Sequence, residues 1–302
     1  MKGRLQDYLL LHFIVFIWGF TAILGKLIEI GALELVLYRT LFAFIILGVF
    51  MTVKKRDFVI GKKEIYKILG TGVIIGLHWI FFFASTKVAT VSVCLAGMAT
   101  ATLWTSILEP LIGRRRVRLF EVLLGLIIIL GLYIIFKFEF NHLLGLIFAV
   151  FSAFLAALFL VINSRFAVKH DHYTITFYEM VGAFLGTAVF LPAYAFWGPD
   201  DYTINLVGSN MDYLYLLILA SICTVYPFSI SVELMKRLTV FSINLTINLE
   251  PVYGIILAVI IFKDKERMSE GFYLGTLIIL LAVITHPFIQ RYRSQRRLKP
   301  PA

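Results

Sequence analysis

Ten apolar stretches, each about as long as the roughly 20 residues that cross a bilayer as a helix, follow one another along this chain. They cover 8–27, 33–53, 65–85, 90–112, 118–136, 141–161, 174–196, 212–232, 239–262 and 269–290. With 302 residues, 60% of them hydrophobic, little sequence remains for a soluble domain, and 197–211 is the one sizeable loop. The pattern therefore predicts an all-α integral membrane protein with ten transmembrane helices.

The net charge of +10 is unevenly distributed between the predicted loops. Counting from the N-terminus, most basic residues fall in the tails and the even-numbered loops, as at Lys54–Arg56 and Arg114–Arg116. Lys and Arg accumulate on the cytoplasmic side of membrane proteins, so both termini are predicted to be cytoplasmic. This distribution makes the lipid bilayer the expected partner and argues against nucleic acid.

Residues 76–134 read like residues 226–284, at a constant spacing of 150 (226 − 76). Ser92 falls opposite Ser242, and Gly125 opposite Gly275. Five spans separate the copies, and an odd number places the second copy upside down. We expect two inverted five-helix repeats, 1–138 and 139–302, in one membrane domain, an architecture typical of secondary transporters.

Three Gly-x-x-x-Gly pairs lie within predicted spans. Such pairs let helix backbones approach closely in a membrane, where lipid removes the hydrophobic drive for association. Packing inside the monomer is favoured over a dimer seam, although a monomer and a homodimer both remain open. The pairs are Gly72 with Gly76, Gly182 with Gly186, and Gly271 with Gly275.

Glu250 and Pro251 stand midway along the ninth span. Proline cannot donate a backbone hydrogen bond, so the helix should kink or loosen there. A free carbonyl beside an intramembrane carboxyl is typical of broken-helix sites in transporters. Glu250 is a candidate for coupling or substrate contact, with a protonated, purely structural Glu250 as the alternative. Further candidates around it are Asn244 and Asn248, with Thr100 and Trp104 in the corresponding fourth span.

Ionisable groups inside spans are costly and need an explanation. Arg39 in the second span is a candidate gate or substrate contact, and Glu179 in the seventh is a structural or gating candidate. His78 in the third span is either a hydrogen-bonded packing residue or a proton relay. The remaining candidates for a cavity wall or gate are Tyr38, Trp18 and Trp79.

Catalytic and cofactor-binding patterns are missing from the sequence. We find no His/Cys cluster at metal-ligand spacing, no glycine-rich phosphate loop and no nucleophile motif. We therefore predict a protein that is not an enzyme and that uses no cofactor or metal. Transport would run on an ion or substrate gradient, with protons as a candidate coupling ion, or simply downhill.

In order along the chain, several short motifs resemble the drug/metabolite transporter superfamily, in particular its ten-span EamA-type members. The chain departs from that pattern at Arg114–Arg116, which replace an acidic step, and at Ala101, where no proline occurs. The motifs are Phe16-Ile17-Trp18-Gly19, Leu37-Tyr38-Arg39, Ala84 to Ser92, Leu249-Glu250-Pro251-Val252-Tyr253 and Asp264-Lys265-Glu266.

This resemblance implies a bacterial inner-membrane carrier with a central cavity between two five-helix halves, exporting amino acids, other metabolites or toxic compounds. We expect a secondary carrier for small molecules that works by alternating access. One alternative is a nucleotide-sugar or phosphorylated-metabolite exchanger, which would need several basic residues in its cavity. The other is a non-transporting membrane scaffold, which would have no polar cavity at mid-membrane.

Overall fold

The computed structural model describes residues 5–113, 119–167, 169–197, 202–234, 236–238, 246–247 and 249–298. Within these ranges the regular structure is entirely helical. Asn244 and Asn248 lie outside the described residues, as do Arg114–Arg116.

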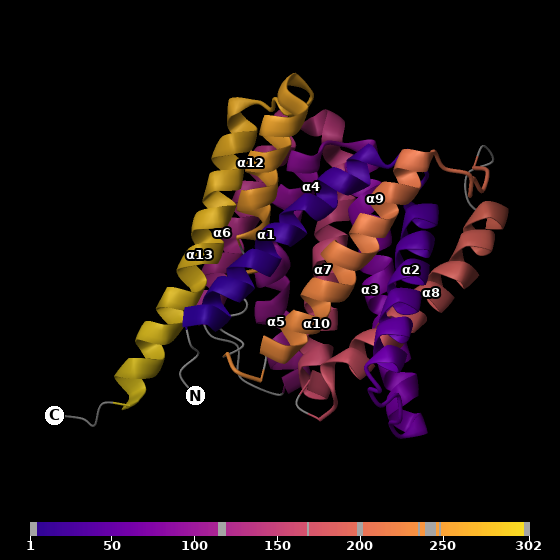
Figure 1. The fold of residues 1–302 in the computed structure, drawn as a ribbon. Coiled ribbons are helices and arrows are strands. Elements are labelled where there is room, and N and C mark those ends of the chain that lie inside the picture. The colour runs from indigo at the N-terminus through magenta and orange to yellow at the C-terminus, as the bar shows by residue number, and fades with distance from the viewer. Residues whose placement is uncertain are drawn as a thin grey trace.

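The helices run up and down beside one another (Figure 1), and α1 begins and α13 ends at the bottom of that view. We call the end of the bundle with residues 28–31, 88–90, 202–209 and 263–269 the upper face, and the opposite end, with 54–61, 169–171 and 236–238, the lower face. The helices are α1 (Leu5–Leu27), α2 (Ala32–Val53), α3 (Lys62–Val88), α4 (Val91–Met98), α5 (Ala101–Gly113), α6 (Leu119–Phe138), η1 (Phe140–His142), α7 (Leu143–Ala167), α8 (His172–Trp197), α9 (Asn210–Ala220), the π-helical turn η2 (Ser221–Val225), α10 (Tyr226–Leu234), α12 (Glu250–Phe262), η3 (Lys263–Glu266) and α13 (Glu270–Leu298).

Seven helical segments in the described part of the chain are long and apolar enough to cross a membrane. Three of them combine elements, since α4 continues into α5, η1 continues into α7, and α9 continues through η2 into α10. The apolar parts of α6 and α13, Leu123–Ile135 and Glu270–Ala282, are shorter. The fold is thus all-helical with several membrane-spanning helices, while the count of ten stays a prediction.

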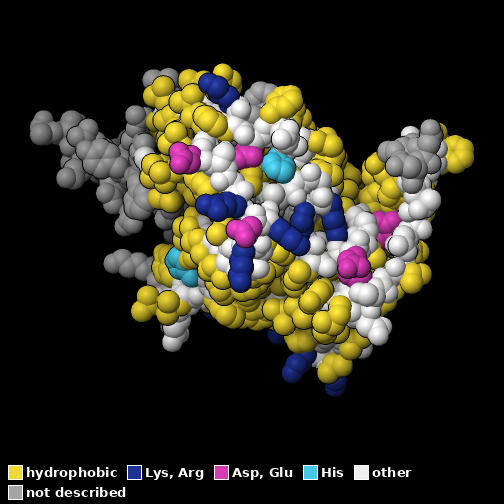
Figure 2. All heavy atoms as spheres, turned by 90° about the horizontal axis from the view of Figure 1, so that it is seen from above, with side chains coloured by type: hydrophobic (Ala, Val, Ile, Leu, Met, Phe, Trp, Pro, Cys, Tyr) yellow, Lys and Arg dark blue, Asp and Glu magenta, His cyan; other side chains and the backbone are white. Residues whose placement is uncertain are grey.

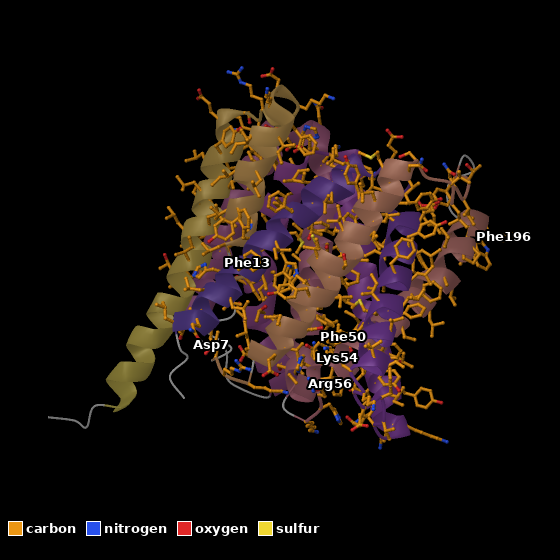
Figure 3. All side chains as sticks on the ribbon, in the orientation of Figure 1. Asp7, Phe13, Phe50, Lys54, Arg56 and Phe196 are labelled. Carbon is orange, nitrogen blue, oxygen red and sulfur yellow. The ribbon has the colours of Figure 1, made fainter. Side chains whose placement is uncertain are left out.

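Large hydrophobic side chains cover the sides of the bundle, such as Phe13 on α1 and Phe196 on α8. Apart from buried groups such as Arg39 and Glu179, charged side chains lie near the ends, where Figure 3 shows Asp7, Lys54 and Arg56 at the lower face. Lipid tails solvate such apolar sides, whereas the polar headgroup region accepts charged ends. The exposed surface therefore fits a bilayer.

The longest helix of the first half, α3, packs tightly against α7 and α8. A Cβ atom added to Gly72 would lie 2.9 Å from the Gly182 Cα, so these two backbones touch with no room for a side chain. Gly275 on α13 meets the Gly131 carbonyl of α6 in the same way, at 2.7 Å. The prediction that the glycine pairs mediate packing within the monomer is confirmed.

At the upper face, charged side chains are bound to helix ends. Figure 2 looks onto this face and shows acidic and basic side chains interspersed among hydrophobic ones. Glu266, which is 2% exposed, accepts hydrogen bonds from the backbone N–H groups of Val91 and Ser92, both at 2.8 Å. A carboxylate at this position complements the dipole at the start of α4. Lys26 donates to the carbonyls of Thr86 at 2.6 Å and Ala89 at 2.8 Å, near the end of α3.

The loop 202–209 is held against α2 by a second set of contacts. The buried carboxylate of Glu34 accepts hydrogen bonds from the Tyr202 hydroxyl at 2.8 Å and from the Asn205 backbone at 3.2 Å. Burial, together with the hydrogen bond to Glu34, raises the pKa of Tyr202 above its ordinary value. Tyr38 also reaches this loop, because its hydroxyl donates to the Leu206 carbonyl at 2.8 Å. Tyr38 therefore helps to hold the loop 202–209 against α2 at the upper face.

Candidate functional site

Arg39 is enclosed in the middle of the helical bundle, with 1% of its surface exposed. Its Nε donates to Thr224 Oγ1 at 2.8 Å. The guanidinium carbon lies 3.9 Å from the centre of the Trp79 ring and 5.5 Å from that of Phe83, within range of cation–π attraction. One terminal nitrogen, Nη1, is buried without a hydrogen-bond partner. An always-charged group therefore presents a free donor in the bundle interior.

The acceptor for Arg39 comes from an irregular turn of the eighth predicted span. Thr224 lies in η2, and its hydroxyl donates to the Leu219 carbonyl at 2.7 Å, five residues earlier. Pro227 is the second residue of α10, directly after this turn, and lacks the N–H that a regular helix would use. A π-helical turn accommodates such a defect and often marks a functional position. The partnership of Thr224 with Arg39 could not be inferred from the sequence and required the structure.

Phe228 joins two of the predicted tryptophans into one aromatic group. Its ring contacts Trp79 at 5.5 Å and Trp18 at 5.7 Å between centroids, both edge to face. Phe159 of α7 adds a further contact at 6.2 Å. The Trp18 Nε1 is buried without an acceptor, so a second free donor lies in this group. Phe228 and Phe159 could not be singled out from the sequence, because phenylalanine recurs throughout the chain.

Glu250 lies in the first turn of α12 and is half-buried. Pro251 follows within that first turn, which is the place in a helix that best tolerates proline. Glu250 and Arg39 attract one another electrostatically, although no ion pair or hydrogen bond joins these two side chains. The structure thus brings together an acidic and a basic candidate from distant parts of the sequence. We call Arg39, Trp79, Trp18, Thr224 and Glu250 the central site.

His78 is occupied by contacts with α7. Its Nδ1 lies 3.0 Å from the Ser152 carbonyl oxygen and 2.8 Å from Ser152 Oγ. The Ser152 hydroxyl also lies 2.9 Å from the His78 carbonyl oxygen. This geometry is that of a packing residue at the α3–α7 contact, and a relay role for His78 stays a prediction.

The other candidates lie apart from this group. Thr100 is buried, and its hydroxyl donates to the Gly97 carbonyl at 2.7 Å in its own helix. Trp104 packs edge to face on Phe154 at 5.3 Å. Glu179 is completely buried on α8, and neither carboxyl oxygen has a hydrogen-bond partner. Glu179 therefore does not belong to the central site, which leaves its burial unexplained.

Comparison with known proteins agrees with the helical architecture and the two-part sequence. The model of the EamA-like transporter family matches residues 7–137 and again residues 143–285. The chain belongs to the EamA-like transporter family. It is therefore a multi-pass membrane protein of a transporter family within the drug/metabolite transporter superfamily. This confirms the resemblance read from the motifs at Trp18, Arg39 and Glu250.

A solved structure entitled "Crystal structure of protein" has a similar fold to this EamA-like chain. The match has a TM-score of 0.64 and covers 96% of this chain and 99% of the other, at 15% sequence identity. At that identity the likeness concerns the fold alone. No curated protein matches the chain.

Proposed function

We propose that this EamA-like protein is a secondary carrier that exports small metabolites such as amino acids, or drugs, across the bacterial inner membrane. It works by alternating access, with ten spans in two inverted five-helix halves and the lower face in the cytoplasm. The observation that carries the proposal is the buried Arg39, whose free Nη1 lies in the same site as the half-buried Glu250. The family membership supports the transport class.

The chemistry of the central site favours substrates that carry a carboxylate. An arginine offers planar donors that match a carboxylate, and it cannot escape its charge by losing a proton. An unpaired charge in the membrane interior is costly, so an anionic substrate group near Nη1 would relieve that cost. Glu250 supplies the opposite charge for a substrate ammonium group. The aromatic rings of Trp79, Trp18 and Phe228 would contact an apolar substrate side chain.

The balance of charges argues against a nucleotide-sugar or phosphorylated-metabolite exchanger. Such substrates carry several negative charges and would favour several basic groups around them. The central site contains one basic residue, Arg39, and one acidic residue, Glu250. Zwitterionic amino acids match this pair better than phosphates do.

The proposal is tested by loading proteoliposomes with an equimolar mixture of unlabelled amino acids and measuring entry of labelled ones by exchange. Wild type should exchange at least one amino acid, and Arg39→Gln should slow that exchange by about two orders of magnitude. Exchange that is equally fast in Arg39→Gln would contradict the role of the central site. A wild type that exchanges no amino acid would exclude that substrate class, and a comparison of culture media with and without overexpression would then identify the exported compound.

A further inference from the structure

Glu179 is the least compensated ionisable group in the described interior. It lies on α8 with none of its surface exposed, and both carboxyl oxygens lack a hydrogen-bond partner. A buried carboxyl without partners is costly in a protein interior and more so in a membrane. The central site does not explain Glu179, because Arg39 and Trp79 approach one another from α2 and α3 without it.

The polar groups nearest to Glu179 do not satisfy it. The Thr71 hydroxyl of α3 is close enough to interact with the carboxyl, but its single hydrogen is donated to the Ile68 carbonyl at 2.8 Å. Thr176 stands one turn before Glu179 on α8, is completely buried, and also has a hydroxyl without a partner. Residues three apart share a helix face. Two unsatisfied oxygen-bearing side chains thus lie together on the buried side of α8.

Among the residues that the structure describes, no charged side chain on the neighbouring helices forms an ion pair with Glu179. Helix α8 packs against α3, α2 and α10, with a smaller contact to α7. Those titratable and charged groups on these helices that form contacts bind residues other than Glu179. Arg39 binds Thr224 and Trp79, His78 contacts Ser152, Glu64 pairs with Lys67, Glu233 pairs with His172 and Arg237, Arg165 binds the Ile112 carbonyl, and the Tyr178 hydroxyl binds the Phe58 carbonyl.

Glu179 lies at the close contact between α3 and α8, where the two helix backbones touch. The Cβ position of Gly72 meets the backbone carbonyl of Glu179, and Gly182 one turn later meets the backbone of Leu69. Such a contact excludes water as long as α3 and α8 stay together. A movement of α8 along α3 would open the carboxyl to one membrane face, which is what alternating access requires of an ion site.

We propose that Glu179 binds the proton that this carrier moves together with, or in exchange for, its substrate. In the proton-binding step the carboxylate takes up one proton from water at one face and becomes a neutral carboxylic acid. After the conformational change, the acid releases the same proton at the other face. One carboxyl with neighbouring hydroxyls offers fewer oxygens than the six or more that Ca²⁺ or Mg²⁺ takes, which favours a proton as the ligand. The proposal rests on the carrier function proposed above.

Proton binding is tested first without any substrate. The full chain in lipid is titrated with buffer while the infrared absorption of carboxylic acids is recorded for wild type, Glu179→Gln and Glu250→Gln. We expect a band that titrates in wild type and in Glu250→Gln and that is lost in Glu179→Gln. A spectrum in which Glu179→Gln removes no titrating band overturns the proposal, whatever the substrate is.

Coupling is tested by comparing two transport modes in proteoliposomes with labelled amino acids as the probe. Net transport driven by a pH gradient needs release and return of the proton, whereas exchange of substrate at equal pH does not. We expect Glu179→Gln to lose net transport and keep exchange, and Glu179→Asp to keep both with a shifted pH profile. Loss of both modes, retention of both, or net transport that follows a Na⁺ gradient overturns the proposal.

The two tests separate the proposals. If wild type transports no amino acid, the substrate class proposed for the central site fails, and the infrared titration still decides whether Glu179 binds a proton. If amino acids are exchanged but the Glu179-dependent band is missing, the carrier function stands and the proton site falls.

Discussion

Charged groups at the upper face of this protein have their hydrogen-bond partners, whereas charged groups in the interior are incompletely satisfied. At the upper face, Glu266 and Lys26 each bind two backbone groups at helix ends. In the interior, Arg39 keeps a free donor, and neither carboxyl oxygen of Glu179 accepts a hydrogen bond of ordinary geometry from a described residue. Satisfied charges hold helices in place, whereas unsatisfied ones lower stability and remain available to a ligand. The difference suggests which charges serve structure and which serve transport.

The largest expected effect comes from changing Arg39, which should impair transport without harming the fold. Arg39→Leu should slow exchange by about two orders of magnitude, since losing a buried charged contact to a ligand costs about 2–5 kcal/mol. Its melting temperature should not fall, because an apolar side chain replaces an incompletely paired buried charge. Exchange assays and thermal unfolding of the same preparations measure both. The matched change Lys26→Met should do the reverse, and a lower melting temperature in both variants would remove the distinction.

Removing the Glu266 carboxylate should lower the stability of the protein and leave its transport unchanged. Glu266→Ala leaves the Val91 and Ser92 N–H groups without their acceptor, and charge-assisted hydrogen bonds of this kind contribute about 1.5–3 kcal/mol each. We expect a lower melting temperature, with normal exchange per folded molecule. Asp264→Ala is the control, because Asp264 is exposed in the same connection. Equal destabilisation by both changes would show that the helix cap is unimportant.

The α3–α8 contact can be tested with two glycines on one helix. In Gly72→Ala the new methyl group meets α8 backbone, so we expect a loss of about 1–3 kcal/mol, typical of overpacking. Gly70→Ala adds a methyl group in open space and should be neutral or stabilising by up to about 1 kcal/mol. Chemical unfolding of both variants in detergent gives the comparison. Equal stability of the two would mean that α3 and α8 are farther apart than described.

The smallest effect concerns Tyr202 and depends on pH. Its raised pKa means that the neutral phenol is favoured in the folded state, so its contribution is complete below the ordinary tyrosine pKa of about 10 and is lost as pH rises through the raised value. Tyr202→Phe should cost about 0.5–1.5 kcal/mol at neutral pH. An ultraviolet titration of wild type should show a late-ionising tyrosine component that is smaller by one residue in Tyr202→Phe. A titration curve unchanged by the substitution would argue against the Glu34 contact.

Much of the candidate site could be named from the sequence because ionisable residues stand out in apolar spans. Arg39, Glu179 and Glu250 were found by that criterion, and the motifs around Trp18 and Arg39 led to the family. Their arrangement could not be found that way. Thr224 and Phe228 are ordinary residues in an apolar helix, and they matter because η2 and α10 place them against Arg39 and the tryptophans.

The sequence by itself determined a membrane-spanning helical protein and its transporter family, because hydrophobic length and short-range motifs are properties of local segments. Glycine spacing likewise predicted close packing, since the Gly-x-x-x-Gly pattern is a property of one face of one helix. Only the tertiary structure decided that His78 is bound to Ser152, that Arg39 keeps a free donor, and that the carboxyl oxygens of Glu179 accept no hydrogen bond of ordinary geometry from the described residues. Whether a buried charge is satisfied depends on atoms contributed by helices far away in the chain, and no local pattern records those contacts.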